Sequence, residues 1–453
     1  MTDVFADLPQ FVAQSEPWFR ERLKTLVEQP TVSPGKLDDV AILAGVDAAG
    51  EVMAASGAQV DVVSTRGTPS LIARFAHPQP KARVVVYNHF DVQPADASKW
   101  DQADPFGFEV RSDPEREFLY LGRGTTDDKG PGLCALRAAE WVARHQLPIE
   151  VLCLWETEEE IGSPHFEDVL HARKDLLAGD CVIVSDTIWP SADSPAISVG
   201  LRGGMLATLT LRTGAKEVHS GLAGGVARNP VRELATLANA IEQAAFWRLD
   251  AIDPSPDELA AFMRSGFETD YFKSSHQLDK LKTELPIEMM IALWARPTFE
   301  VHGLAGGYQG RGVKSTIPEV AELKISFRLV PDQDPQRLFA RLEQFVNLFN
   351  PDVEIGRVAD FVPYRGVTEG RVHEAIVHGM TTAFGKRPAL VREGGSIGAV
   401  PKMASVLGVP IHFLPLSLPE HAYHAPNERF DWKQAKGGIA AFVHTFARLA
   451  GVG

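Results

Sequence analysis

The first half of the chain contains short segments that are rich in Val, Ile and Leu. They are 70–76 (SLIARFA), 82–90 (ARVVVYNHF), 150–156 (EVLCLWE) and 179–186 (GDCVIVSD). Strands with this pattern are typical of a parallel sheet that is buried on both faces. Between them, residues 130–145 open with Gly-Pro-Gly and continue with apolar residues at helical spacing, which predicts a helix. The sequence therefore predicts an α/β fold with a mixed, mainly parallel sheet flanked by helices.

The order of elements changes after residue 203. The pattern predicts strands at 203–214, 321–331 and 352–362, with helices at 229–246 and 334–350 between them, followed much later by a last helix at 432–450. This order is typical of a small α+β domain of the ferredoxin-like type. A chain of 453 residues with 45% apolar content also favours two domains. We expect a main domain of residues 1–203 plus 366–453 and an inserted lid of residues 204–365, in which residues 251–300 show no clear pattern.

Charge and composition narrow the class of partner. The formal net charge is −14 and no basic run is present, which argues against a nucleic-acid or anionic-membrane partner. Neither a signal-peptide core nor a stretch approaching roughly 20 apolar residues is visible, so we predict a cytoplasmic protein. The three cysteines, Cys134, Cys153 and Cys181, lie in apolar segments and are expected in the core.

Metal-competent side chains follow three of the predicted strands. His89 and Asp91 follow the second, the run of glutamates at 158–160 follows the third, and Asp186 follows the fourth. Taken singly, each has a structural explanation: a core histidine, a turn residue, a solvated face or a helix cap. Because the carboxyl ends of parallel strands meet at one edge of a sheet, we expect these side chains in one crevice.

Buried carboxylates in such a crevice need cations. Asp127, Glu159, Glu160 and Asp186 have no basic cluster near them in the sequence, and uncompensated burial of charge is very costly. Carboxylate and imidazole ligands suit Zn²⁺ first and Mn²⁺ second. We therefore predict two divalent metal ions per chain, with one carboxylate left free to take a proton from water. Adjacent glutamates in a turn can divide these two tasks.

Eight ordered motifs carry a family resemblance: YNHFDVQP, GRGTTDDKGP, ETEEEIGS, VSDTIWP, EVHSGLAGG, STIPEVAELKISFRLVP, REGGSI and HAPNERF. Together they resemble the carnosine-dipeptidase branch of the acetylornithine deacetylase, succinyl-diaminopimelate desuccinylase and aminoacylase family of co-catalytic zinc hydrolases. The resemblance covers roughly residues 60–440 and implies the zinc-peptidase type of fold.

The resemblance implies a role for each matching residue in the main domain. His89 and Asp186 would bind one metal, Glu160 and His424 the other, and Asp127 would bridge them. Glu159 would be the general base, Asp91 would orient the ring of His89, and a cis peptide would join Asp127 to Asp128. His421 is a second candidate histidine, and only the match of HAPNE to the family motif selects His424. The same register leaves Glu158 as a solvent or structural residue.

The lid would supply the remaining groups. By resemblance, His219 stabilises the oxyanion in the active site of a partner subunit, which implies a homodimer through the lid; the alternative is a structural loop histidine. Ser315, Arg328, Gly395 and Ser396 match positions that hold the free carboxylate of a substrate, a task suited to a guanidinium. Ser315 stands where relatives commonly have Thr.

The implied activity is hydrolysis of the peptide bond of dipeptides or short peptides. Asp186 favours a dipeptidase, because deacylases and carboxypeptidases of the family usually have Glu at this position. An N-acyl-amino-acid deacylase or a carboxypeptidase remains an alternative within the family. A relative that only binds metal, without catalysis, is the alternative from another class.

Overall fold

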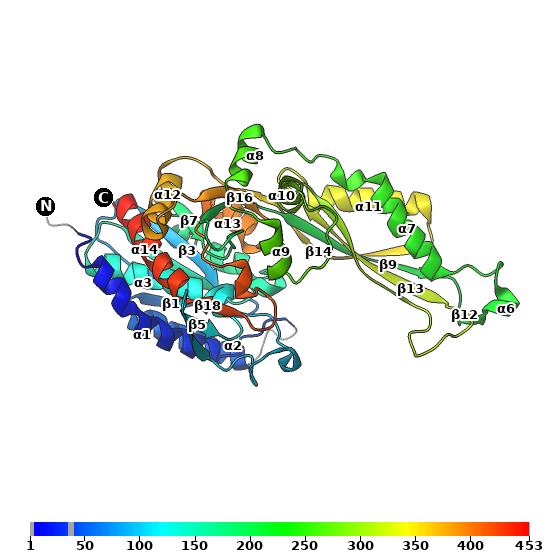
Figure 1. Cartoon of the computed structure of the whole chain (residues 1–453), viewed down its shortest axis with the longest axis horizontal. Coiled ribbons are helices and arrows are strands. Elements are labelled where there is room, and N and C mark those ends of the chain that lie inside the picture. Colours follow the sequence, from blue (N-terminus) through cyan, green and yellow to red (C-terminus); the bar gives the residue numbers. More distant parts are fainter. Residues whose placement is uncertain (1–3, 35–39, 453) are drawn as a thin grey trace.

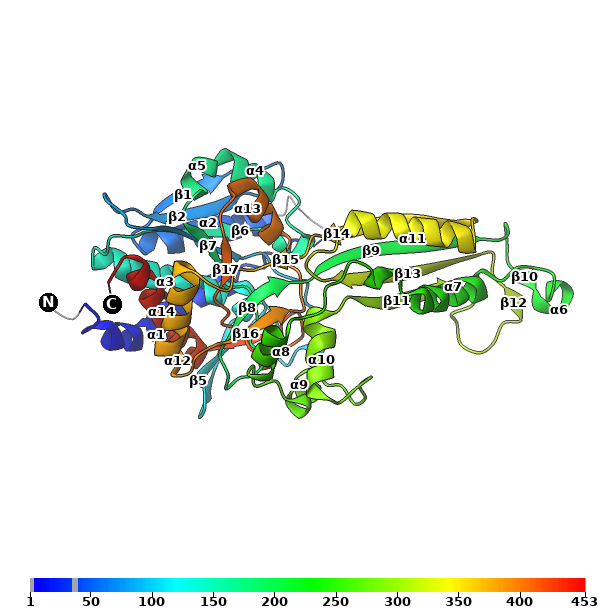
Figure 2. The ribbon, with the colours of Figure 1, turned by 90° about the horizontal axis from the view of Figure 1, so that it is seen from above.

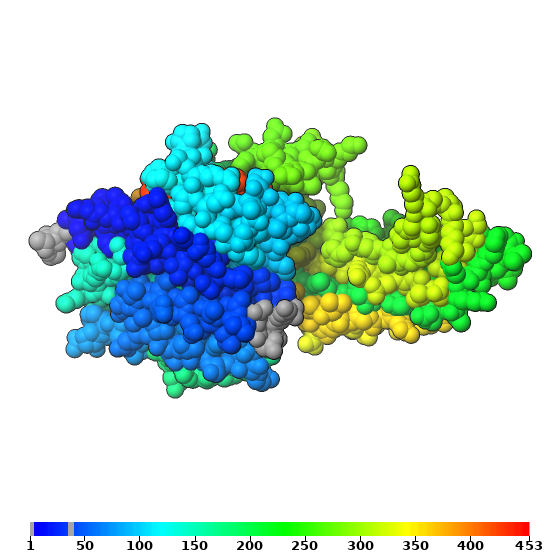
Figure 3. All heavy atoms as spheres, turned by 90° about the horizontal axis from the view of Figure 1, so that it is seen from below, coloured from blue at the N-terminus to red at the C-terminus, as the bar shows by residue number. Residues whose placement is uncertain are grey.

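The computed structural model describes residues 4–34 and 40–452, which form a body and an elongated lid (Figure 1). The body holds both ends of the described chain, and the lid extends from it as a narrower arm (Figure 3). Among the described residues, no helix is long and apolar enough to cross a membrane.

A six-stranded sheet forms the centre of the body. Its order is β1 (Gln59–Val63), β2 (Ser70–Phe75), β6 (Glu150–Glu156), β3 (Arg83–His89), β7 (Cys181–Val184) and β17 (Ile411–Phe413). The last four strands are mutually parallel, whereas β1 and β2 pair antiparallel. This arrangement confirms the predicted mixed, mainly parallel sheet. Every residue of β6 and β7 is buried, which explains why these segments are apolar at successive positions.

Helices cover both faces of this sheet. One face packs against α1 (Leu8–Val27), α2 (Val40–Ala55), α3 (Gly130–Arg144), α12 (Arg371–Phe384) and α14 (Trp432–Leu449). The other face packs against α4 (Phe166–Ala172), α5 (Lys174–Leu177) and α13 (Ala399–Leu407). Successive residues of β3 and β6 point alternately into these two cores. Cys134, Cys153 and Cys181 are buried and free, as expected.

Two small sheets complete the body. One has the order β15 (Tyr364–Arg365), β8 (Ala196–Leu201) and β16 (Ala389–Glu393). The other has the order β18 (Arg429–Asp431), β5 (Glu117–Leu121) and β4 (Glu109–Asp113). Both sheets join segments that lie far apart in the sequence, so residues from both ends of the chain meet around the central sheet.

The lid is a split β-α-β-β-α-β unit. In chain order it comprises β9 (Gly203–Arg212), α7 (Pro230–Ala244), β11 (Thr298–Gly306), β13 (Val320–Leu329), α11 (Pro335–Phe349) and β14 (Val353–Phe361). The sheet order β11-β13-β9-β14, with every pair antiparallel, is that of a ferredoxin-like domain. At its far tip lie β10 (Val218–His219), α6 (Ser220–Ala223) and β12 (Thr316–Ile317) (Figure 1).

Residues 245–297 connect α7 to β11 by way of the body. They form η4 (Phe246–Arg248), α8 (Pro256–Met263), α9 (Thr269–Ser275), α10 (Pro286–Met290) and η5 (Ile291–Ala295). Helix α8 and η5 contact β16, α10 contacts α8, and α9 contacts η6 (Pro419–His421) of the body (Figure 2). Phe262, Met290 and Trp294 join the apolar core of the body. The expected insertion of residues 204–365 thus contains a segment that packs on the body, and its last lid strand ends at Phe361.

Candidate metal centre

His89 is the last residue of β3, and its buried ring is held by the loop that follows. Its Nδ1 lies 3.0 Å from the carbonyl oxygen of Asp91 and 3.4 Å from Oδ1 of the same residue. The Asp91 carboxylate also accepts hydrogen bonds from Ser33 Oγ at 2.6 Å and from the backbone N–H groups of Glu159 and Glu160. Asp91 therefore joins the His89 ring to the turn that carries the two glutamates.

The Asp127 carboxylate lies between two histidines from distant parts of the chain. It belongs to the bent segment η2 (Thr125–Lys129), in which the peptide bond between Asp127 and Asp128 is cis, as expected. Its Oδ1 is 3.0 Å from Nε2 of His89, and its Oδ2 is 2.8 Å from Nε2 of His424. A carboxylate that bridges two cations presents its two oxygens to different ligand sets in the same way.

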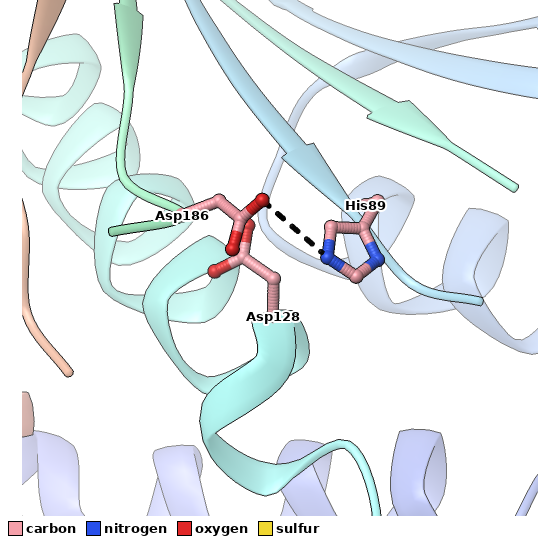
Figure 4. Close-up of side chains that lie close together, drawn as sticks. All are labelled: His89, Asp128 and Asp186. Atoms are coloured by element: carbon pink, nitrogen blue, oxygen red, sulfur yellow. Dashed lines mark ion pairs between the residues drawn. The ribbon is translucent and has the colours of Figure 1, made fainter. Parts of the chain in front are cut away.

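Two groups of potential metal ligands meet at this carboxylate. His89, Asp128 and Asp186 form one group, and Asp127, Glu160 and His424 form the other. In Figure 4, His89 and Asp186 approach from two neighbouring strands while Asp128 points to them from the turn. The His89 Nε2 atom is 3.7 Å from Asp186 Oδ2, and the His424 Nε2 atom is 3.1 Å from Glu160 Oε2.

The topology of the sheet explains why these residues meet. Strand β3 lies between β6 and β7, and all three run parallel. Their carboxyl ends therefore place His89, the turn η3 (Glu159–Ile161) and Asp186 at one edge. The segment with Asp127 enters from the start of α3, and His424 enters from the loop before β18. Sequence reasoning from strand ends thus predicted the correct edge of the sheet.

The electrostatics of the cluster fit divalent cations. Burial raises the pKa of Glu159 well above its usual range and raises that of Asp186 to about 7. Within the described residues, the ion pairs of Asp127, Glu160 and Asp186 join them to histidines and to no lysine or arginine. Asp128 Oδ1 is buried and accepts no hydrogen bond. Several buried carboxylates together with two imidazoles are a donor set suited to Zn²⁺ or Mn²⁺.

The alternatives that the sequence left open have distinct surroundings. His421 is buried, with Nε2 2.9 Å from Asp431 Oδ2 and Nδ1 3.0 Å from Thr126 Oγ1, so it faces away from the metal ligands. The structure brings His424 to the cluster instead. Glu158 is also buried, and it accepts hydrogen bonds from the Thr68 backbone N–H and from His165.

Sequence reasoning missed several residues that support the ligands. The Tyr423 hydroxyl donates to Asp186 Oδ1, and Gln93 Nε2 donates to Glu160 Oε2 at 2.7 Å. Asn88 Nδ2 donates to Asp128 Oδ2 at 2.7 Å. Outer groups of this kind orient metal ligands. Their only signal in the sequence is that Asn88 and Gln93 lie within the motif YNHFDVQP and that Tyr423 directly precedes the motif HAPNERF.

Glu428 has a separate role under the centre. Its fully buried carboxylate accepts hydrogen bonds from the backbone N–H groups of Gly124, Thr126 and Asp127 at 2.9, 2.9 and 3.1 Å. It also forms a buried ion pair with Arg123 at 2.8 Å. The turn that presents Asp127 is therefore held in place by a side chain that comes about 300 residues later in the sequence.

The expected substrate-binding residues fall into two places. Arg328 Nη1 lies 3.3 Å from Ser396 Oγ, and Gly395 is the neighbouring residue in the loop after β16. Ser315 does not join them in one chain. It lies beside His219 at the tip of the lid, where the Ser220 N–H donates to the Ser315 carbonyl at 2.9 Å. His219 is exposed, and its Nδ1 accepts a hydrogen bond from the Gly221 N–H at 2.8 Å.

A family model described as peptidase family M20/M25/M40 matches residues 85–448. The chain belongs to this family. The matched range contains every residue of both ligand groups, from His89 to His424.

Individual relatives are similar over most of their length. The Beta-Ala-His dipeptidase of Rattus norvegicus is 26% identical over 401 residues, covering 84% of this chain and 80% of the relative. The Cys-Gly metallodipeptidase dug1 of Schizosaccharomyces pombe is 27% identical over 405 residues, covering 85% and 83%. The solved structure of the metallo-carboxypeptidase Sso-CP2 from Sulfolobus solfataricus is 25% identical, with a TM-score of 0.85 and coverage of 95% and 98%.

Proposed function

We propose that this protein hydrolyses the peptide bond of dipeptides or short peptides with the help of two divalent metal ions. The observation that carries the proposal is the Asp127 carboxylate, whose oxygens face His89 and His424 separately. Membership of a peptidase family and similarity to proteins named as dipeptidases support the reaction class.

Each residue of the centre has a proposed task. His89 and Asp186 would hold one cation, Glu160 and His424 the other, and Asp127 both. Bound cations would supply Lewis acidity and would lower the pKa of water. Zn²⁺ is the first choice and Mn²⁺ the second.

Glu159 is the proposed general base. Unlike Glu160, it forms no ion pair with either histidine in the described part of the chain, and its backbone N–H donates to Asp91. Its carboxylate would accept a proton from the attacking water as the new C–O bond forms. It would then deliver that proton to the amine as the C–N bond breaks. Burial raises the pKa of Glu159, and cations held by the neighbouring ligands would lower it, which would keep the group ionised before attack.

A homodimer through the lid is part of the proposal. The tip carries Leu222, Val226 and Val313, with exposed fractions of 89%, 90% and 97%, and β11 is an exposed edge strand. Apolar tips and an unpaired edge of this kind favour association with a second copy. His219 and Ser315 lie at that tip, far along the arm from the body of their own chain (Figure 1). We infer that both residues act in the partner subunit, His219 as an oxyanion donor and Ser315 on the substrate carboxylate.

A panel of substrates tests the reaction class. We expect free dipeptides to be hydrolysed faster than N-acetylated amino acids or longer peptides, with Zn²⁺ or Mn²⁺ present in turn. Preference for N-acetylated amino acids would support the deacylase alternative, and preference for longer peptides the carboxypeptidase alternative, which the similarity to Sso-CP2 keeps open. A protein that binds both metal ions and cleaves none of these substrates would be a non-catalytic relative.

A further inference from the structure

A cavity of about 670 Å³ adjoins the candidate metal centre. Tyr423, whose hydroxyl donates to Asp186, forms part of its wall, as do Ile188, two residues beyond Asp186, and Gly395. Its volume lies within the roughly 300–1,000 Å³ that is usual for small-molecule sites. The cavity therefore borders the candidate metal centre through Tyr423, and it is large enough to receive part of a substrate.

The far wall of the cavity is apolar and largely aromatic. Phe267, Tyr271, Phe272 and Trp294 line it. The Phe267 ring lies 5.8 Å from Trp294 in an edge-on arrangement and 5.6 Å from Phe272, so the rings support one another. Aromatic walls of this kind offer large apolar contact areas with little loss of side-chain freedom.

The charged groups on the wall already have partners. Arg392 forms an ion pair with Glu258. Glu393 accepts hydrogen bonds from the backbone N–H groups of Gly394, Gly395 and Ile188. The aromatic side of the cavity therefore favours an apolar occupant.

The aromatic wall comes from a segment that the lid does not need for its own sheet. Residues 245–297 join α7 to β11, whereas connections between such elements usually have about 2–6 residues. Long connections of this kind are often functional. Here the segment crosses to the body and builds one side of the cavity.

The position of the cavity indicates which end of the substrate it receives. Of the proposed carboxylate-binding residues, Gly395 lines the cavity, whereas Arg328 and Ser396 contact each other outside its lining. The guanidinium that would hold the carboxylate therefore lies outside the cavity, and the cavity wall includes Tyr423, which donates to Asp186. We propose that it binds a bulky apolar side chain, aromatic or branched aliphatic, on the N-terminal residue of the substrate. This inference rests on the proposed dipeptidase function.

Matched dipeptides test the preference directly. We expect kcat/KM for Phe-Gly and Leu-Gly to exceed that for Ala-Gly by a factor on the order of 10 to 200, the usual range for filling an apolar pocket. Changing the second residue, Ala-Phe against Ala-Gly, should have a smaller effect.

Two neighbouring serines of α9 provide a matched pair of variants. Ser275 lines the cavity, whereas Ser274 is exposed and lies outside its lining. Each hydroxyl donates to the carbonyl three residues earlier, at 3.1 and 3.0 Å. Ser275→Phe should fill the cavity and lower the Phe-Gly to Ala-Gly ratio of kcat/KM by about tenfold or more. Ser274→Phe should leave that ratio unchanged. Ser275→Leu against Ser274→Leu repeats the comparison with a side chain that is easier to accommodate.

The possible outcomes separate this inference from the function on which it rests. If the native protein cleaves no dipeptide, the proposed function and this inference both fail. If it cleaves dipeptides without preferring a bulky N-terminal residue, or prefers a bulky C-terminal one, the function stands and the inference is overturned. An equal fall in the Phe-Gly to Ala-Gly ratio of kcat/KM in the Ser275 and Ser274 variants would also overturn the inference.

Discussion

The two parts of the proposed active site differ in how their side chains are held. In the body, His89, Asp127 and Asp186 are buried and fixed by hydrogen bonds from several segments. At the lid tip, His219 and Ser315 are exposed and make only local contacts. Precise placement of metal ligands needs such support, whereas a group that is supplied to another subunit must stay accessible. This contrast is what we expect if, as we propose, the metal centre is formed within one chain and catalysis is completed between two.

Removing the metal ions should have the largest effect, because it disables the part of the proposed active site that lies in the body. We expect about two ions per chain by elemental analysis and complete loss of hydrolysis after chelation, restored by Zn²⁺ or Mn²⁺. Burial raises the pKa of Asp186 to about 7, so below that pH a proton must leave before a cation can bind. Metal affinity should therefore fall as the pH is lowered from 8 to 6, with proton release measurable by calorimetry in buffers of different ionisation enthalpy. Reproducible binding of a single ion would contradict the shared carboxylate.

Replacing the proposed base should reduce hydrolysis nearly as much and should leave the metal ligands intact. Glu159→Gln removes the proton acceptor and keeps the shape of the side chain, so kcat should fall by a factor on the order of 10² to 10⁴ with metal content unchanged. Glu158→Gln is the matched control, because Glu158 bonds to Thr68 and His165 rather than to the centre. Loss of activity in the control but not in Glu159→Gln would place the base one residue earlier.

The variant His219→Ala tests the proposed role of the lid tip. We expect kcat to fall by a factor of about 10² to 10³, with KM less affected. His77→Ala is a suitable control, since His77 Nδ1 also accepts a backbone N–H two residues later but lies on the body. Mixing His219→Ala chains with Glu159→Gln chains should restore up to about half of the native activity per heterodimer, because one site then has both groups intact. No recovery after demonstrated subunit exchange would mean that His219 serves its own chain or is a structural loop residue.

The smallest expected effect concerns the support of a ligand. Tyr423→Phe removes the hydroxyl that donates to Asp186, and we expect a loss of about 10- to 100-fold in metal affinity, measured by competition with a chelator. Tyr120→Phe removes a comparable hydrogen bond to Glu16, remote from the ligands, and should leave metal affinity unchanged. Equal metal affinities in the two variants would show that metal binding does not depend on the contact between Tyr423 and Asp186.

The sequence predicted those elements whose hydrophobic pattern lies within a single segment of the chain. Strands β3 and β6 were predicted nearly to the residue, because burial on both faces makes each an unbroken apolar run. Strand β11 was missed, because it is an edge strand with mostly exposed side chains and no such pattern. Helices α8 to α10 were missed because they are short and bury their apolar residues against a distant part of the chain.

The same distinction applies to the site. The ends of strands predicted from local pattern alone that His89 and Asp186 lie at one edge, whereas His424 lies in a turn and was selected only through the motif resemblance. Contacts such as that between Tyr423 and Asp186 depend on how two distant loops approach each other. No spacing within one segment encodes that approach.

The buried carboxylate of Glu428 has a consequence for the order in which the molecule matures. It ties down the backbone of the turn that carries Asp127, and His424 stands four residues before it. During synthesis the other ligands leave the ribosome long before these two residues do. A nascent chain that has already completed its lid would still lack a working centre. We therefore expect metal loading to be a late, post-translational event, and chains interrupted before residue 424 to fold parts of the body without acquiring high-affinity metal.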